Sequence, residues 1–307
     1  MEIYLTSSPF AGHEDPAQSH TDSANREISD VNDFEERLEK SAKGCKKGLF
    51  IAADPDNAAA TDGFSRDTKN ALDRSGIHLE TWKTLDRRNA ADAAKLVGES
   101  DFIVLAGGHT PTQNRFFREI RLKELLEDKN GAGRKGKEKK RLGSIGVDGL
   151  KTLMGAFGVP VNDPDDDDDK NERLRTAAMN STSGKCVLLG ISAGSMNAAS
   201  TVYAQPEEEG ESVDPKYERF MPGLGLTDVM IIPHYQRIKD RILDGKRLFE
   251  DITVPDSMGR YLYLLSDGSY LYTNGDISRI YGELHIMKDG VIRKVAGKGG
   301  TTALIDD

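Results

Sequence analysis

The segment Gly190-Ile191-Ser192-Ala193-Gly194 ends an apolar run that begins at Cys186, and it fits the pattern G-x-S-x-G. In this pattern a serine lies at a sharp turn between a strand and a helix, and its hydroxyl faces a cleft at the carboxyl edge of a sheet. Small neighbours are needed because the turn crowds the backbone. The pattern predicts Ser192 as a nucleophile and the amide of Ala193 as a donor to a developing oxyanion. The alternative is a structural turn with an incidental serine.

A serine hydroxyl becomes a strong nucleophile only when a base removes its proton. Among the six histidines, His234 stands out because it directly follows the apolar segment VMIIP, so it should also emerge at the edge of a sheet. It lies after the serine in the chain, an order known from α/β hydrolases. The alternative is a lone structural histidine.

A carboxylate must orient such a histidine. Between the serine and the histidine, the acidic cluster PEEEGE follows the short strand-like segment VYAQ, which favours Glu207 to Glu209. At most one of the acidic residues in this interval can complete a triad, and the others are expected in a solvated loop. They are Glu207, Glu208, Glu209, Glu211, Asp214, Glu218 and Asp228.

The elements that must position these residues alternate between apolar runs and polar, helix-like stretches. We expect strands at 48–54, 77–81, 101–106 and 186–191, with helices near 33–43, 67–75 and 90–97. Strands that alternate with helices at this spacing predict an α/β fold with a doubly wound, mostly parallel sheet that helices cover on both faces. The C-terminal part predicts short antiparallel strands, the last two joined around Asp289-Gly290.

Composition and charge exclude several classes of protein. The 307 residues carry a formal net charge of −9, which disfavours general binding to nucleic acids or to anionic membranes. No apolar run approaches the roughly 20 residues that cross a bilayer, and the N-terminus does not resemble a signal peptide. Two cysteines, Cys45 and Cys186, provide neither a disulfide framework nor a metal quartet. We therefore expect a cytoplasmic protein without a metal or an organic cofactor.

Two charged stretches interrupt this pattern. Residues 129–141 are rich in lysine, arginine and glycine, and residues 162–170 read NDPDDDDDK. Such runs repel themselves and rarely pack. We expect a single domain over 1–307 with a charged, flexible insertion at about 125–180. A regulatory or nucleic-acid-binding role for the basic stretch is the alternative.

Three motifs in fixed order resemble the peptidase E family of serine peptidases. They are GGHT at 107–110, GISAGSMN at 190–197, and GLGL…IIPHYQ at 223–236. The family contains α-aspartyl dipeptidases and, more distantly, cyanophycinases. The resemblance implies a fold like that of class I glutamine amidotransferases, with a serine in place of their cysteine. It also implies hydrolysis of dipeptides or short peptides through an acyl-enzyme.

The resemblance assigns roles to individual residues. Ser192 would be the nucleophile, His234 the base, and Gly108 the second oxyanion donor beside Ala193. The triad acid maps to Glu207 when counted from the serine, and to Glu209 when counted backward from Val213-Asp214-Pro215. We favour Glu207.

The chain departs from the aspartyl dipeptidases at two positions where substrate contacts are expected. An asparagine of the family is replaced by His109 and an arginine by Tyr203. Loss of a cation weakens the case for an acidic substrate residue, and His109 either contacts the substrate or bonds to the turn backbone. Alternative functions are an esterase or a β-aspartyl isopeptidase with the same triad, or a catalytically silent homologue that binds a small molecule. The resemblance suits a monomer or a homodimer.

Overall fold

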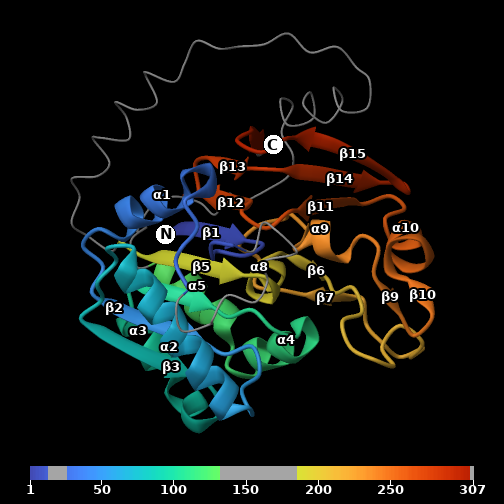
Figure 1. The fold of residues 1–307 in the computed structure, drawn as a ribbon. Coiled ribbons are helices and arrows are strands. Elements are labelled where there is room, and N and C mark those ends of the chain that lie inside the picture. Colours follow the sequence, from blue (N-terminus) through green and yellow to red (C-terminus); the bar gives the residue numbers. More distant parts are fainter. Residues whose placement is uncertain (13–25, 132–184, 305–307) are drawn as a thin grey trace.

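The computed structural model describes residues 1–12, 26–131 and 185–304, and its centre is an eight-stranded sheet (Figure 1). The strand order is β16-β13-β12-β1-β5-β4-β2-β3. Five neighbouring strands, β1-β5-β4-β2-β3, are parallel. The other three extend the sheet beside β1, and each pairs with its neighbour in antiparallel fashion. The strands are β1 (Glu2–Thr6), β2 (Lys47–Ile51), β3 (Thr81–Leu85), β4 (Phe102–Leu105), β5 (Val187–Ile191), β12 (Tyr270–Thr273), β13 (Ser278–Tyr281) and β16 (Thr301–Leu304).

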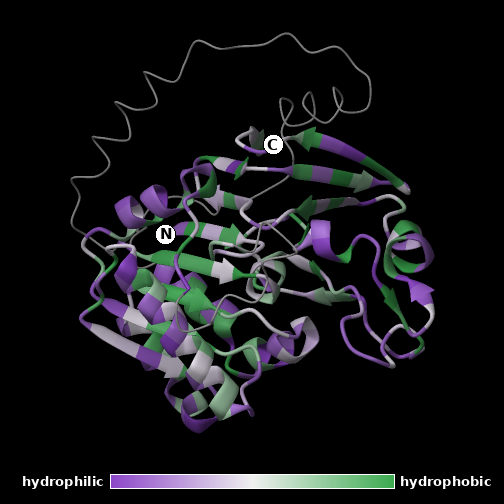
Figure 2. Cartoon of the chain, in the orientation of Figure 1, coloured by the Kyte–Doolittle hydropathy of each residue, from purple (hydrophilic) through white to green (hydrophobic). Residues whose placement is uncertain are grey.

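Helices cover both faces of this sheet because its inner strands are apolar on both sides. Leu49 and Ile51 pack in one core cluster, whereas Phe50, between them, packs in the other. The first cluster includes residues of α3 (Ala93–Glu99), α4 (Thr110–Glu119) and α5 (Leu122–Gly131), and the second includes residues of α1 (Phe34–Ala42) and α2 (Ala58–Arg74). Figure 2 shows the hydrophobic colour concentrated in the central strands. The predicted fold class, a mostly parallel α/β sheet flanked by helices, is confirmed.

A second sheet of four strands lies in the C-terminal part of the chain, with the order β15-β14-β11-β8. Its strands are β8 (Ile231–Ile232), β11 (Tyr261–Leu265), β14 (Leu284–Lys288) and β15 (Val291–Ala296). Only the β8–β11 pairing is parallel. The turn between β14 and β15 is at Asp289 and Gly290, both with positive φ, as expected for a two-residue hairpin. The predicted antiparallel C-terminal strands are therefore present.

Shorter elements complete the fold. Two small antiparallel pairs are β6 (Thr201–Tyr203) with β7 (Phe220–Pro222), and β9 (Ile242–Leu243) with β10 (Lys246–Arg247). Short helices are α8 (Ala193–Asn197), α9 (Tyr235–Ile238) and α10 (Val254–Asp256), with 3-10 turns at Val31–Asp33 and Arg87–Asp92 and a π-helical turn at Leu248–Thr253. No helix in the described ranges is long and apolar enough to cross a membrane.

The structure corrects two sequence-based boundaries. The strand predicted at 77–81 is in fact β3 at Thr81–Leu85. Ile77 and Leu79 are buried in the connection from α2, and the strand itself is half exposed at the sheet edge, so its own apolar signal is weak. The insertion predicted from about residue 125 begins later, because α5 continues to Gly131 and buries Leu126. The remainder of that predicted insertion lies outside the described residues.

The carboxyl ends of the parallel strands point to one edge of the central sheet. Ser7 follows β1, Ser192 follows β5, and the glycine pair 107–108 follows β4 by two residues. In open α/β sheets, ligands bind outside the carboxyl ends of the strands. The candidate site is therefore expected where these turns meet.

Candidate active site

Ser192 occupies the turn between β5 and α8 in a strained backbone conformation. Its φ is 49° and its ψ is −110°, which is unusual for a residue with a side chain and costs on the order of 1–3 kcal/mol. The flanking glycines allow the turn. A Cβ on Gly190 would lie 2.9 Å from Leu5 Cδ2, and one on Gly194 would overlap the carbonyl oxygen of Leu105. The turn is thus built to hold one serine at the sheet edge.

His234 lies within hydrogen-bond distance of this serine. Its Nε2 is 3.0 Å from Ser192 Oγ, and its side chain is 26% exposed, so the pair is open to solvent on one side. The histidine follows β8 and precedes α9, with a left-handed backbone of φ 58° and ψ 28°. The structure therefore brings together the two residues that the sequence singled out.

Asp267 is the acid that contacts the histidine. Its Oδ1 lies 2.6 Å from His234 Nδ1, and its side chain is fully buried. The pairing of β8 with β11 explains this position, because Ile232 lies opposite Leu264 and the two chains leave the sheet in the same direction. His234 lies two residues after Ile232, and Asp267 lies three residues after Leu264, so both leave the sheet at the same end.

Several groups keep the Asp267 carboxyl ionised. Burial by itself would raise its pKa, but the hydrogen bond and charge of His234, a 2.6 Å hydrogen bond from Ser7 Oγ, and the guanidinium of Arg237 together hold the pKa below its ordinary value. Arg237 Nη1 lies 3.6 Å from Asp267 Oδ2. The backbone N–H of Asp267 also donates to Gln236 Oε1 at 3.0 Å. The short helix α9 thus supplies two side chains that contact Asp267: Arg237 faces its carboxylate, and Gln236 accepts from its backbone N–H.

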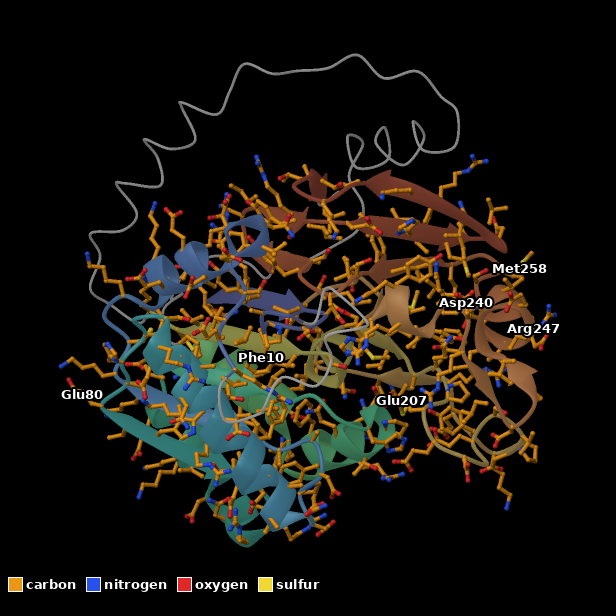
Figure 3. The ribbon with its side chains drawn as sticks, in the orientation of Figure 1. Phe10, Glu80, Glu207, Asp240, Arg247 and Met258 are labelled. Atoms are coloured by element: carbon orange, nitrogen blue, oxygen red, sulfur yellow. The ribbon has the colours of Figure 1, made fainter. Side chains whose placement is uncertain are left out.

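The expectation that Glu207 orients His234 is wrong. Its Oε1 accepts from the backbone N–H of Thr110 at 3.4 Å, at the start of α4. In Figure 3, Glu207 lies between α4 and the lobe that carries β9 and β10. Burial raises the pKa of its carboxyl, an effect that Glu211 reinforces and Thr110 and His109 oppose. The alternative acid Glu209 is exposed, and Asp267 occupies the place beside the histidine that either glutamate would need.

Asp267 was not among the predicted candidates for the acid, which were the carboxylates between the serine and the histidine. Asp267 lies 33 residues after His234, in the turn SDG between two apolar strands. An aspartate before a glycine is common in turns, so the local pattern indicated only a reverse turn. The available signal was its position two residues after the end of YLYLL, which places it near a strand end, as His234 is after VMIIP.

The two segments predicted to supply the oxyanion donors lie beside the serine. Ala193 is the first residue of α8, where a backbone N–H has no acceptor within the helix. The glycine turn lies against the elbow, since a Cβ on Gly107 would be 3.4 Å from Ser192 Cβ. Gly108 has no room for a side chain, because a Cβ there would lie 2.7 Å from Ala53 Cβ. The structure therefore places both segments beside the nucleophile.

The two predicted substrate contacts have other partners. Tyr203 is 1% exposed, and its hydroxyl bonds to Thr253 Oγ1 and Asp256 Oδ2, so it is a core residue. Its predicted role in contacting substrate is wrong. His109 bonds to side chains and not to the turn backbone, with Nδ1 2.8 Å from Thr112 Oγ1 and Nε2 2.7 Å from Glu211 Oε1. Both ring nitrogens of His109 are thus engaged within the protein.

One group of side chains has a composition that could hold a metal ion. The ligand atoms of His109, Glu208 and Glu211 all lie within 4.8 Å of one another. The direct hydrogen bond between His109 and Glu211 accounts for much of this closeness. Glu211 Oε2 also accepts from the backbone N–H groups of Glu207 and Glu208, as expected of a carboxylate that organises a loop.

Comparison with known proteins shows a similarity to a peptidase family over part of the chain. Residues 170–281 match the model of peptidase family S51. No curated protein matches the chain significantly. A solved peptidase from an acI-B1 Actinobacterium is similar at 18% identity and a TM-score of 0.49, with 99% of this chain and 96% of that chain covered. A putative peptidase E protein from Listeria monocytogenes EGD-e is similar at 15% identity and a TM-score of 0.49, with 94% and 98% covered.

The matched segment contains the elbow serine and both residues that follow it in the hydrogen-bonded line, His234 and Asp267. The motifs GISAGSMN and IIPHYQ, on which the resemblance in the sequence rests, also lie inside it. This part of the chain, with the nucleophile elbow and the histidine motif, is therefore similar to peptidase family S51.

Proposed function

We propose that this protein is a serine peptidase that hydrolyses dipeptides or other short peptides with Ser192, His234 and Asp267 as its catalytic triad. The observation that carries the proposal is the continuous line of hydrogen-bond distances, 3.0 Å from Ser192 Oγ to His234 Nε2 and 2.6 Å from His234 Nδ1 to Asp267 Oδ1. The preference for short peptides rests on the resemblance to the peptidase E family, which includes dipeptidases.

The first half of the reaction follows from this geometry. Ser192 Oγ attacks the carbonyl carbon of the scissile bond, and His234 Nε2 takes the serine proton. Asp267 accepts from Nδ1–H, so it selects the tautomer that leaves Nε2 free to act as a base, and it stabilises the imidazolium that forms. The backbone N–H groups of Gly108 and Ala193 would donate to the oxyanion of the tetrahedral intermediate.

The second half returns the enzyme to its starting state. His234 gives its proton to the leaving amine, the C–N bond breaks, and the acyl group remains as an ester on Ser192. Water then attacks this ester while His234 again acts as the base, and collapse of the second tetrahedral intermediate releases the carboxylic acid product and the free serine hydroxyl. Each proton that His234 accepts is donated in the same half-reaction.

Hydrolysis of a panel of short peptides tests the proposal. The panel holds Asp-X, β-Asp-X, neutral and basic dipeptides together with a p-nitrophenyl ester, and it compares wild type with Ser192→Ala. We expect at least one dipeptide to be cleaved by wild type, and the mutant rate to fall by about 10⁴-fold or more. Folded wild-type protein that cleaves the ester but no dipeptide would instead indicate an esterase. Cleavage that survives in Ser192→Ala would remove the serine from the mechanism.

A further inference from the structure

Ser7 is a completely buried serine whose hydroxyl contacts both the base and the acid of the triad. It is 0% exposed and directly follows β1, the strand that pairs with β5. Its Oγ accepts from the backbone N–H of His234 at 2.7 Å and donates to Asp267 Oδ1 at 2.6 Å. The backbone of Ser7 is itself held, because its N–H donates to the carbonyl of Ser269 at 3.2 Å.

The direction of these two hydrogen bonds is set by chemistry. A backbone N–H can only donate, and an ionised carboxylate can only accept. The single hydroxyl proton of Ser7 must therefore point at Asp267, while a lone pair faces His234. Since Asp267 Oδ1 also accepts from His234 Nδ1, the three residues form a closed ring of hydrogen bonds.

This ring fixes a backbone conformation that would otherwise be costly. His234 has a φ of 58°, and a residue with a side chain seldom adopts a positive φ. The direction in which the imidazole leaves the main chain depends on that φ, the torsion about the N–Cα bond. The hydrogen bond to Ser7 Oγ holds the N–H at one end of this bond. Ser7 thus constrains the imidazole from its backbone side, and Asp267 constrains it from its ring side.

We propose that Ser7 is a positioning residue for the serine peptidase reaction. It holds the His234 backbone and the Asp267 carboxylate in one fixed relation, so that Nε2 stays aimed at Ser192. The inference rests on the proposed function and extends it to the residue that directly follows β1, which lies outside the segment matched by the family model.

The test compares Ser7→Ala and Ser7→Thr with wild type and with Ser100→Ala. Ser100 is a matched control because it is 5% exposed, donates one hydrogen bond to the carbonyl of Leu96 at 2.7 Å, and lies just before β4, at the opposite end of that strand from the glycine turn. Two rates are measured: hydrolysis of the best dipeptide, and covalent labelling of Ser192 by a small fluorophosphonate. Labelling needs an activated serine but no peptide.

We expect Ser7→Ala to lower kcat and the labelling rate by about 10- to 100-fold, the effect of removing a hydrogen bond to a charged group. KM should stay within about threefold because Ser7 makes no contact that would bind substrate uniformly. Ser7→Thr restores the hydroxyl and should label faster than Ser7→Ala. Ser100→Ala should lose stability to a similar extent and keep the wild-type rates. Where Ser7→Ala does not stay folded, Ser7→Cys replaces it with the same expectation, because a thiol is a weak donor.

The outcomes separate this inference from the proposed function. If wild type labels rapidly at Ser192 but cleaves no peptide, the peptidase proposal fails. The role of Ser7 can then still be tested, because the labelling rates of its variants can be compared with that of wild type. A wild-type labelling rate in folded Ser7→Ala would overturn the inference. A Ser7→Thr rate no higher than that of Ser7→Ala would also overturn it, because the hydroxyl would then not be the active feature.

Discussion

Replacing Asp267 by asparagine removes one negative charge and almost no volume, so it isolates the electrostatic role of the acid. In wild type the carboxylate Oδ1 receives two hydrogen bonds of 2.6 Å, from His234 Nδ1 and from Ser7 Oγ. An asparagine can place its oxygen there and keep both bonds without the charge. It can also place its NH₂ group there, which reverses the histidine tautomer and turns a protonated nitrogen toward Ser192.

The expected loss can be worked from this geometry. The positive charge of the imidazolium and the negative charge of the carboxylate are each spread over several atoms, so a 2.6 Å contact corresponds to an effective separation of about 4 Å. At an effective dielectric constant of about 20, the attraction is about 4 kcal/mol, or about a thousandfold in rate. A reversed tautomer adds to this loss, and the same change in other serine triads costs about 10⁴-fold in kcat. We therefore expect kcat of Asp267→Asn to fall by about 10³- to 10⁴-fold.

The matched variant is Glu207→Gln, which makes the same chemical change at the acid that the sequence favoured. Glu207 contacts the start of α4 and not His234, so its variant should keep kcat within about tenfold of wild type. Both are assayed by dipeptide hydrolysis, with the melting temperature recorded to show that each is folded. The reasoning is refuted if Glu207→Gln falls a thousandfold while Asp267→Asn stays within tenfold of wild type.

Two further variants test the surroundings of the site. Tyr203→Phe leaves Asp256 and Thr253 without the tyrosine hydroxyl, so the free energy of unfolding in urea should fall by about 1–3 kcal/mol while KM is unchanged; a tenfold rise in KM would return Tyr203 to the substrate site. Arg237 helps to hold the pKa of Asp267 below its ordinary value, so its stabilising effect is present above about pH 4 and is lost as the pH falls through the native-state pKa. Arg237→Gln should therefore lower the free energy of unfolding at neutral pH by less than about 1 kcal/mol, because the arginine is partly exposed. This deficit should disappear on acidification, and a deficit that is independent of pH would contradict the ion pair.

The parts of the site that could be predicted from sequence are those with a local physical signature. Ser192 needs glycines at fixed neighbouring positions, and His234 follows an apolar strand directly, so both were readable within a dozen residues. Asp267 has no such local signature. It lies beside His234 because β8 pairs with β11, and patterns in a single sequence do not reveal that pairing. The bounds of edge strand β3 were misplaced for a related reason, since its half-exposed residues carry little apolar periodicity.

The connection between the two sheets explains why the acid comes so late in the chain. β11 belongs to the four-stranded sheet and β12 to the eight-stranded sheet, so the turn that holds Asp267 is the point where the chain passes from one to the other. β12 pairs with β1, which leads to Ser7, while β11 pairs with β8, which leads to His234. Asp267 can therefore bond to both residues only when the two sheets hold their register relative to each other. A shift of β11 against β8 would move the carboxylate away from the imidazole even if the nucleophile elbow remained intact.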